Sequence, residues 1–453
     1  MSGNDPNTTR YLYKHFWQIK SISYNPLPFF LKLLEKYGSY VNISFLNSFA
    51  LTNDPRIIRY ILQKNNKNFK KAPFINEAIK AQVGNGILTT EGPRWLKQRR
   101  AVQPGFHRKR LESISNTMTE VIDEYLTTEM LAYAEKKRDF MVDKEMMHLA
   151  YKIVSKSLFG DQVDEALLGQ IDEIISKGQE YTIFKIRRPF SGFRQWVSGE
   201  QKRNRKRKEF SDQLVLDIIR NRMKSQHQGK DDLLQMLLDT EYEDGTKMNE
   251  QELLDESMIL YVAGHETTAL ALSWAFYLVA KHPDIEEKIL KEADTVLGNR
   301  NPQFNDLMAL PYSLQVLNES MRLYPPVWII DRQAKENDEF EGVRFKKDKA
   351  IMCLIYAMHR HPDYWPNPEK FDPGRFALKN KNEKWQEAFM PFGAGPRLCI
   401  GNSFALMEMQ LVLIMTLRRF KFIVNEKHPI ELNPLITLRP RHGIKMRVVK
   451  RFP

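Results

Sequence analysis

Apolar and polar residues are arranged along the chain in a way that predicts many helices and a few short strands. Residues 40–55 alternate apolar and polar side chains around Asn47 and Ser48, which is the pattern of a β-hairpin. Strand patterns return at residues 343–357 and 435–449, whereas most of the chain between the first two regions repeats its apolar residues with a helical period. The sequence therefore predicts a mainly α fold with small β-sheets (α+β).

Proline and glycine predict several helix ends. A helix within residues 91–104 begins near Pro93 and ends near Pro104. Another has Pro283 in its first turn and ends before Gly298. A third, within residues 311–326, is stopped by two prolines, and residues 362–388 contain too many breakers for regular structure.

The longest apolar stretch, residues 258–280, has the length of a membrane span, but it carries His265 and Glu266 at its centre. An ionisable pair there would be costly in lipid, so we expect the buried central helix of a large domain. The first twenty residues have no apolar run of signal-peptide or anchor length. We therefore expect a soluble, cytoplasmic protein without a transmembrane anchor.

Composition narrows the class of protein. The chain has 453 residues, 42% of them hydrophobic, which can support a substantial core. Two cysteines cannot form a disulfide framework, so a reducing compartment fits better than secretion. The net charge is +13, and the densest basic run is residues 202–208. No RNA-binding or zinc-finger pattern accompanies that run, so we expect the solvated face of a helix and no nucleic-acid partner.

The loop "PFGAGPRLCIG" at residues 391–401 places Cys399 just before a strong helical pattern. A thiol at a helix N-terminus is expected to have a lowered pKa, because the helix dipole favours the thiolate, and Arg397 adds positive charge. Such a thiolate can serve nucleophilic catalysis, a metal cluster or axial ligation of haem. No local signature supports a nucleophile, and a cluster needs more thiols than Cys353 can add. Haem needs one thiolate, cations for its two propionates and an apolar slot.

This loop and four other motifs resemble the cytochrome P450 family. The F-x-x-G-x-R-x-C-x-G pattern falls on Phe392, Gly395, Arg397, Cys399 and Gly401. The other motifs follow in the family's order: "WLKQR" at 95–99, "AGHETT" at 263–268, "ESMR" at 319–322 and "FDPGRF" at 371–376. The likeness runs from about residue 37 onwards. It implies one catalytic domain over residues 1–453, with residues 1–36 as a lead-in, no fused reductase, and haem between the long central helix and the cysteine loop with its following helix.

The resemblance implies how haem b (iron-protoporphyrin IX) would be bound. Cys399 would be the axial ligand of the iron, which is the known role of a thiolate in this enzyme class. Phe392 would pack beside the sulfur, and backbone N–H groups after Cys399 would tune it. Gly401 would let the backbone approach the flat cofactor closely. The residues expected to bind the propionates are Trp95, Arg99, Arg332 and Arg397.

Two further groups follow from the resemblance. Thr267 would hold oxygen and a water, Glu266 would relay protons inward, and Gly264 would leave room for oxygen. The competing interpretation is that Thr267 bonds back to the preceding turn while Glu266 swings to solvent. The second group is a structural clamp for the cysteine loop, formed by Glu319, Arg322 and Arg375. Gly374 stands where the family often has an acidic residue.

The substrate is expected to be lipophilic, such as a fatty acid or a terpenoid, because the implied pocket is apolar. Core packing is the competing interpretation for each lining residue. The implied lining residues are Phe74, Ile87, Leu88, Ala263, Val327, Ile329 and Ile436. Residues 183–196 are a candidate mobile lid or membrane-touching surface.

The resemblance implies a haem-thiolate monooxygenase that inserts one oxygen atom from O2. Because the chain shows no flavin, nicotinamide or iron–sulfur module, a separate ferredoxin or flavodoxin with its NAD(P)H-dependent reductase would supply electrons. Arg108, Lys109 and Arg110, with Arg418 and Arg419, could form its docking patch. Two alternatives stay open: a peroxide-dependent haem-thiolate hydroxylase or rearrangement enzyme, and a non-enzymatic haem- or lipid-binding protein.

Overall fold

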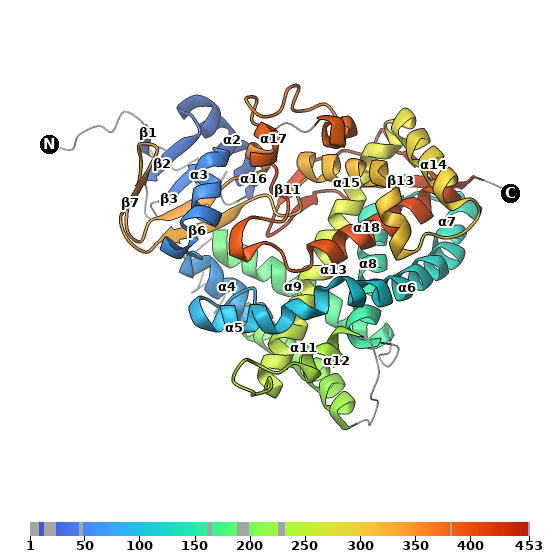
Figure 1. Ribbon diagram of the computed structural model, residues 1–453, viewed down its shortest axis with the longest axis horizontal. Coiled ribbons are helices and arrows are strands. Elements are labelled where there is room, and N and C mark those ends of the chain that lie inside the picture. The colour runs from blue at the N-terminus through green and yellow to red at the C-terminus, as the bar shows by residue number, and fades with distance from the viewer. Residues whose placement is uncertain are drawn as a thin grey trace.

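The computed structural model describes residues 9–12, 24–44, 49–160, 165–187, 199–224, 232–380 and 383–451 (Figure 1). The longer helices are α2 (Pro26–Tyr37), α4 (Pro73–Val83), α5 (Gly92–Val102), α6 (Arg108–Tyr125), α8 (Val142–Phe159), α9 (Glu165–Arg187), α11 (Glu200–Lys224), α13 (Glu250–Ala280), α14 (Pro283–Leu297), α15 (Pro311–Leu323) and α18 (Asn402–Arg419). The shorter ones are α3 (Pro55–Arg59), α7 (Leu131–Glu135), α12 (Leu233–Asp239), α16 (Ile355–Met358) and α17 (Glu383–Glu387).

The described strands form small sheets. The six-stranded sheet has the order β1 (Thr9–Leu12), β2 (Tyr40–Ser44), β3 (Phe49–Thr52), β9 (Ala350–Cys353), β6 (Ile330–Ala334) and β4 (Phe69–Lys70). The smaller sheets are β10 (Phe420–Val424), β13 (Lys445–Lys450) and β5 (Phe140–Met141); β11 (Leu432–Pro434) and β12 (Leu438–Pro440); and β7 (Asp338–Phe340) and β8 (Val343–Phe345). The mainly helical prediction is therefore confirmed.

Helix α13 passes through the middle of the molecule, between α8 and α18 (Figure 1). It begins with a capping box, in which the Asn249 side chain accepts from the Glu252 N–H at 2.9 Å and the Glu252 carboxylate accepts from the Asn249 N–H at 3.2 Å. Apolar residues lie on nearly every side of the helix, so most of its length is buried. The predicted central helix is confirmed, and it begins earlier than expected. No helix among the described residues is long and apolar enough to cross a bilayer.

The predicted hairpin is also confirmed. Strands β2 and β3 pair antiparallel, with Tyr40 opposite Thr52, while the turn around Asn47 lies outside the described residues. β3 then pairs in parallel with β9, which puts Thr52 opposite Cys353. The hairpin near the N-terminus is thereby joined to the second predicted β region, and the strand pattern at residues 435–449 becomes β12 and β13.

Helix α2 lies within the lead-in and was not predicted. Asn25 caps it by accepting from the Leu27 N–H at 3.3 Å, and Pro26 occupies its first turn. Its apolar face is buried against the sheet and against the C-terminal part of the chain. The buried residues of this cluster include Leu27, Phe30, Leu33, Leu34, Trp328 and Leu438. Helix α2 is therefore part of the core.

Other predicted elements have their expected ends. α14 begins at Pro283 and ends before Gly298, whose φ is +55°, and α15 begins at Pro311. The basic run at residues 202–208 lies on α11, where Arg203 pairs with Glu200 at 2.8 Å. Residues 183–187 complete α9, and the rest of the candidate lid, residues 188–196, lies outside the described residues.

Candidate active site

The cysteine loop is held in one shape by two glycines. Gly393 and Gly395 have φ values of +75° and +70°, which L side chains rarely adopt. A Cβ atom at Gly395 would overlap the carbonyl oxygen of Leu62, so the loop backbone approaches this turn as only glycine allows. The Cys399 N–H donates to the Phe392 carbonyl at 3.0 Å, which closes the loop before α18 begins at Asn402.

The electrostatic environment of Cys399 differs from the expectation. Burial among protein atoms raises the pKa of its thiol, whereas the Gly401 N–H and the charge of Arg99 act in the opposite direction. The prediction of a lowered pKa is therefore wrong for the chain alone, because Cys399 lies outside the first turn of α18 and burial dominates. The residue still has accessible surface. A metal ion bound to the sulfur would deprotonate it, since coordination favours the thiolate.

Cationic and aromatic side chains gather beside the cysteine loop. The Arg397 guanidinium lies over the Trp95 ring, 4.3 Å from its centroid, and its Nη2 donates to the Thr90 carbonyl at 2.7 Å. Arg99 donates from Nη1 to the Leu398 carbonyl at 2.8 Å. The structure thus brings Trp95, Arg99 and Arg397 together around the residues next to Cys399.

Two more cations belong to this cluster, Arg332 on β6 and Lys71 beside β4. Burial, together with the charges of Arg397 and Arg332, lowers the pKa of Lys71 to about 7, although Asp331 and Glu91 oppose the shift. The buried Nη1 of Arg397 has no hydrogen-bond partner among the described residues. Glu91 pairs with Nη2 of Arg397 at 2.8 Å, which balances one cation of the cluster. The buried Nη1 donor is still costly without a partner, and the other cations need anions. These residues therefore fit the two propionates of haem.

The Thr267 hydroxyl donates to the Ala263 carbonyl at 2.7 Å. This is the back-bond of the competing interpretation, and it leaves the hydroxyl oxygen able to accept a hydrogen bond. A Cβ atom at Gly264 would lie 3.0 Å from Cγ2 of Val154, so the glycine lets α13 and α8 pack closely. Ala263 is exposed on this helix, one turn before Thr267.

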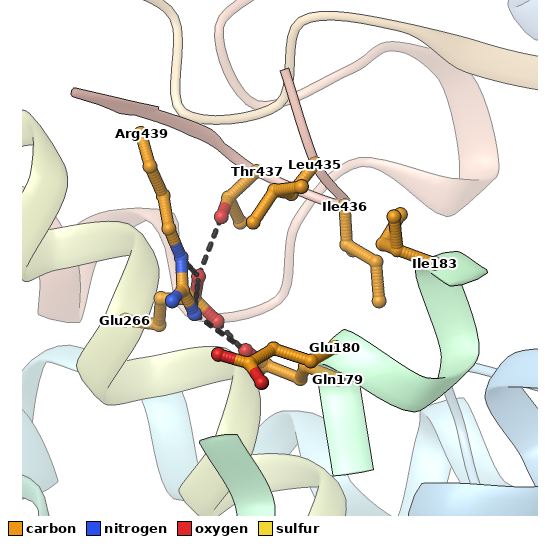
Figure 2. A pocket seen from close by; sticks show the side chains of 8 residues that line it. All are labelled: Gln179, Glu180, Ile183, Glu266, Leu435, Ile436, Thr437 and Arg439. Atoms are coloured by element: carbon orange, nitrogen blue, oxygen red, sulfur yellow. Dashed lines mark hydrogen bonds and ion pairs between the residues drawn. The ribbon is translucent and has the colours of Figure 1, made fainter. Parts of the chain in front are cut away.

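Glu266 is buried and is not turned towards solvent. Its Oε1 accepts from the Thr437 hydroxyl at 2.5 Å and from Nε of Arg439 at 2.7 Å, and its Oε2 accepts from Nε2 of Gln179 at 2.5 Å (Figure 2). Arg439 also donates to Oε1 of Gln179 at 2.6 Å. These four side chains, from α9, α13 and the β11–β12 hairpin, line a cavity of about 10 Å³, which is room for about one water.

The structure brings the three clamp residues together. Arg322 donates from Nε and Nη2 to the two carboxylate oxygens of Glu319 at 2.7 and 2.8 Å, and both side chains are fully buried. Arg375 reaches the same carboxylate at 3.3 Å. Nη1 of Arg322 donates to the carbonyls of His359 and Pro368 at 2.9 and 2.7 Å. The clamp therefore ties α15 to the irregular segment that precedes the cysteine loop.

Two of the implied substrate stretches lie together. The Trp328 indole donates to the Leu435 carbonyl at 2.9 Å, which fixes Val327 and Ile329, on either side of Trp328, near Ile436. Ile436 also lines the small cavity beside Glu266, opposite Ile183 of α9 (Figure 2).

The third implied stretch belongs to α4 and the turn that follows it. Phe74 and Leu88 are exposed, by 46% and 39%, whereas Ile87 is 7% exposed. Exposed apolar side chains of this size suit a ligand surface better than a core.

Sequence reasoning missed several residues of the site. Lys71, Gln179, Thr437 and Arg439 belong to no short motif, and each lies far along the chain from its partners. The one local signal is Thr437 and Arg439 at alternate positions of a strand pattern, which places both on one face.

The fold and site define a protein that can hold haem through a single cysteine thiolate. A family model described as Cytochrome P450 matches residues 5–447. The chain therefore belongs to the cytochrome P450 family, and it is a haem-thiolate monooxygenase. The resemblance seen in the sequence is confirmed.

Individual relatives agree with this assignment. Pentalenene oxygenase of Streptomyces avermitilis is 28% identical over 443 residues, covering 97% of this chain and 95% of that protein. The retinoic acid-bound cyanobacterial CYP120A1 covers 94% of this chain and 95% of its own, with a TM-score of 0.82 and 23% identity. The match to the haem domain of cytochrome P450DA covers 98% of this chain and 97% of that one, with a TM-score of 0.87 and 23% identity. The two structures confirm the predicted fold.

Proposed function

We propose that the protein binds haem b through Cys399 and inserts one oxygen atom from O2 into a C–H or C=C bond of a lipophilic substrate, in the cytoplasm. The observation that carries the proposal is the accessible Cys399 beside a cluster of cations. Glu91 pairs with Arg397 at 2.8 Å, but Nη1 of Arg397 stays buried without a hydrogen-bond partner among the described residues. When bound, the haem activates dioxygen at its iron with two electrons and two protons.

The residues around the haem site have separate tasks in this proposal. Trp95, Arg99 and Arg397 bind the propionates, together with Arg332 and Lys71. Phe392, at one end of the cysteine segment, shields the sulfur. Gly401, at the other end, donates its backbone N–H to the sulfur.

Proton transfer is the task of Thr267 and Glu266. The Thr267 hydroxyl already donates to Ala263, so its oxygen accepts from a water at the oxygen site. Glu266 can pass a proton only after it exchanges one of its three donors for a water, and the cavity of about 10 Å³ beside it has room for that water. Opening the Arg439 or Gln179 contact is thus part of the proposed relay.

The lipophilic substrate class is supported by the apolar residues near the site. Phe74, Leu88, Val327, Ile329 and Ile436 offer aliphatic or aromatic surface from three separate stretches. Two neighbours that have ligands in their names, pentalenene oxygenase and the retinoic acid-bound structure, support the same class.

A separate ferredoxin or flavodoxin would deliver electrons at the start of α6. Arg108, Lys109 and Arg110 occupy its first turn, where the helix dipole disfavours cations, and no acidic residue is present there. Such a cost is offset when an acidic partner docks. Arg418 and Arg419 contribute less, because they pair with Asp294 and Asp123. Lys109→Glu should slow reduction by the partner at unchanged substrate affinity; equal effects on both would contradict docking.

The carbon monoxide complex of the reduced holoprotein tests the proposal. A thiolate-ligated haem should give the red-shifted Soret band, and Cys399→Ser should abolish it. A wild-type protein without the band, or a variant with an unchanged spectrum, would refute ligation by Cys399. Fast turnover with hydrogen peroxide in the absence of a reductase would instead support the peroxide-dependent alternative.

A further inference from the structure

The turn after α4 rests on two neighbouring carboxylates of the central helix. Oδ2 of Asp255 accepts from the Asn85 N–H at 2.9 Å. Both carboxylate oxygens of Glu256 accept from the Ile87 N–H, at 3.0 and 3.1 Å. Asp255 is 5% exposed and Glu256 is fully buried. Two acids on α13 therefore hold two alternate amides of one turn.

The glycines of this turn fit the carboxylates closely. Gly84 has a φ of +86°, and a Cβ atom there would overlap the Asp255 carboxylate. A Cβ atom at Gly86 would lie 2.9 Å from Oε2 of Glu256. Any side chain at either position would push the turn away from α13. The sequence "GNG" at residues 84–86 is thus matched to the acids at residues 255 and 256.

The turn also reaches the haem site at its other end. The Thr90 hydroxyl donates to Oε1 of Gln98 at 2.6 Å, and Gln98 donates to the Asn85 carbonyl at 3.2 Å. The Thr90 carbonyl accepts from Arg397 at 2.7 Å. Ile87 and Leu88 lie between these fixed points. A shift of the turn on α13 would therefore move two implied substrate residues relative to the propionate cluster.

We propose that Asp255 and Glu256 are positioning residues for substrate binding, which fix Ile87 and Leu88 over the substrate by holding the amides of the turn at residues 84–88. The proposal rests on the proposed function, because it assumes that Ile87 and Leu88 contact substrate. A purely structural role would need no acids here, since an amide oxygen also accepts from an N–H group at a lower burial cost.

The acids make the turn sensitive to pH. Burial raises the pKa of Glu256 to about 7; the charges of Asp255 and Glu252 act in the same direction, and the Ile87 N–H and Arg94 oppose them. The other titratable groups that face the pair are Tyr242, which follows α12, and Asp212 of α11 with its partner Lys208.

The sign of the pH effect follows from linkage. The turn is called seated while its amides contact Asp255 and Glu256, and lifted when they contact water instead. If Glu256 has its ordinary pKa of 4.5 in the lifted turn, the seated turn binds more protons than the lifted one. Seating is then strongest at low pH and is lost as pH rises through about 7. Between pH 6 and pH 8 the equilibrium constant for seating should fall by up to about tenfold. The affinity for a ligand that needs the seated turn can fall by no more than this factor.

Two measurements on the holoprotein test the proposal. The first is spectral titration with dodecanol, a neutral probe whose own charge does not change with pH. The second is hydrogen exchange of the amides at residues 85 and 87, expressed as protection factors. In the wild type both dodecanol affinity and protection should fall by up to about tenfold from pH 6 to pH 8. Glu256→Gln, which mimics the neutral acid, should give flat profiles. The control is Glu250→Gln. Glu250 lies on α13, as Glu256 does, but it is exposed and pairs with Arg220 of α11, so this variant should keep the wild-type profile.

The outcomes separate this proposal from the proposed function. A wild-type pH dependence that persists in Glu256→Gln, or wild-type protection at residues 85 and 87 in Glu256→Ala, would overturn the positioning role. Should Glu256→Ala fail to fold, Asp255→Ala, which removes the acceptor of the Asn85 N–H, must still lower the protection of residue 85, and unchanged protection overturns the proposal. A missing red-shifted carbonyl band would refute the proposed function instead, and the exchange data would still report on the turn.

Discussion

Replacing Arg322 with methionine should destabilise the protein by about 4 kcal/mol. Methionine keeps much of the volume of the side chain but removes the donors to Glu319, which stays fully buried. Breaking a buried ion pair from one side typically costs about 3–5 kcal/mol, because the remaining charge is uncompensated. Here Arg375, at 3.3 Å, and the Asp372 N–H, at 2.9 Å, still serve the carboxylate, which favours the lower limit of about 3. The carbonyls of His359 and Pro368 lose their donor and add about 1 kcal/mol.

Urea unfolding of the holoprotein, followed by tryptophan fluorescence and by the Soret band, measures this loss. The decisive comparison is the double variant Glu319→Leu/Arg322→Met, which removes the orphaned charge and should be more stable than Arg322→Met alone. A loss below about 1 kcal/mol in the single variant would refute the estimate. A double variant no more stable than the single one would show that the buried carboxylate is not the cause.

Three further changes test the haem site. Thr267→Ala should release peroxide and lower product formed per electron pair; unchanged coupling would remove its role in proton transfer. Arg439→Met should remove one of the three donors to Glu266 and alter the solvent isotope effect on turnover, and an unchanged isotope effect would exclude Arg439 from the relay. Lys71→Met should weaken haem retention yet stabilise the haem-free protein at pH 6. The wild-type lysine loses its charge on folding above its lowered pKa of about 7, so stability should rise by up to about 1.4 kcal/mol per pH unit from pH 7 to 10. A stability that is flat over that range in the haem-free wild type would contradict this.

Local sequence patterns predicted those parts of the molecule whose physics is local. Proline and glycine set the ends of α14 and α15, and a one-turn spacing put Glu319 and Arg322 on one side of a helix. The cysteine loop was predictable because its glycines, its arginine and its cysteine are all within one short segment. Helix α2 was not predicted because its apolar face packs against residues far along the chain, such as Trp328.

The missed site residues depend on tertiary contacts. Lys71 is one lysine among many basic residues until the sheet places it beside Arg332 and Arg397. Arg439 looks like any charged residue of a C-terminal strand until the hairpin carries it to Glu266. The prediction of a lowered thiol pKa was wrong for a related reason. The helix end was visible in the sequence, but the desolvation of the Cys399 thiol by neighbouring protein atoms was not.

The parallel pairing of β3 with β9 constrains how the chain is made. The strand around Leu51 and the apolar face of α2 are synthesised early. Their partners, residues 350–353 and Leu438, leave the ribosome about 300 and about 400 residues later, respectively. At roughly 5–20 residues per second these delays are about 15–60 s and about 20–80 s. During this interval the N-terminal segment exposes an unpaired strand edge and the apolar face of a helix. Productive synthesis should therefore depend on a chaperone that shields both until the last quarter of the chain has been made.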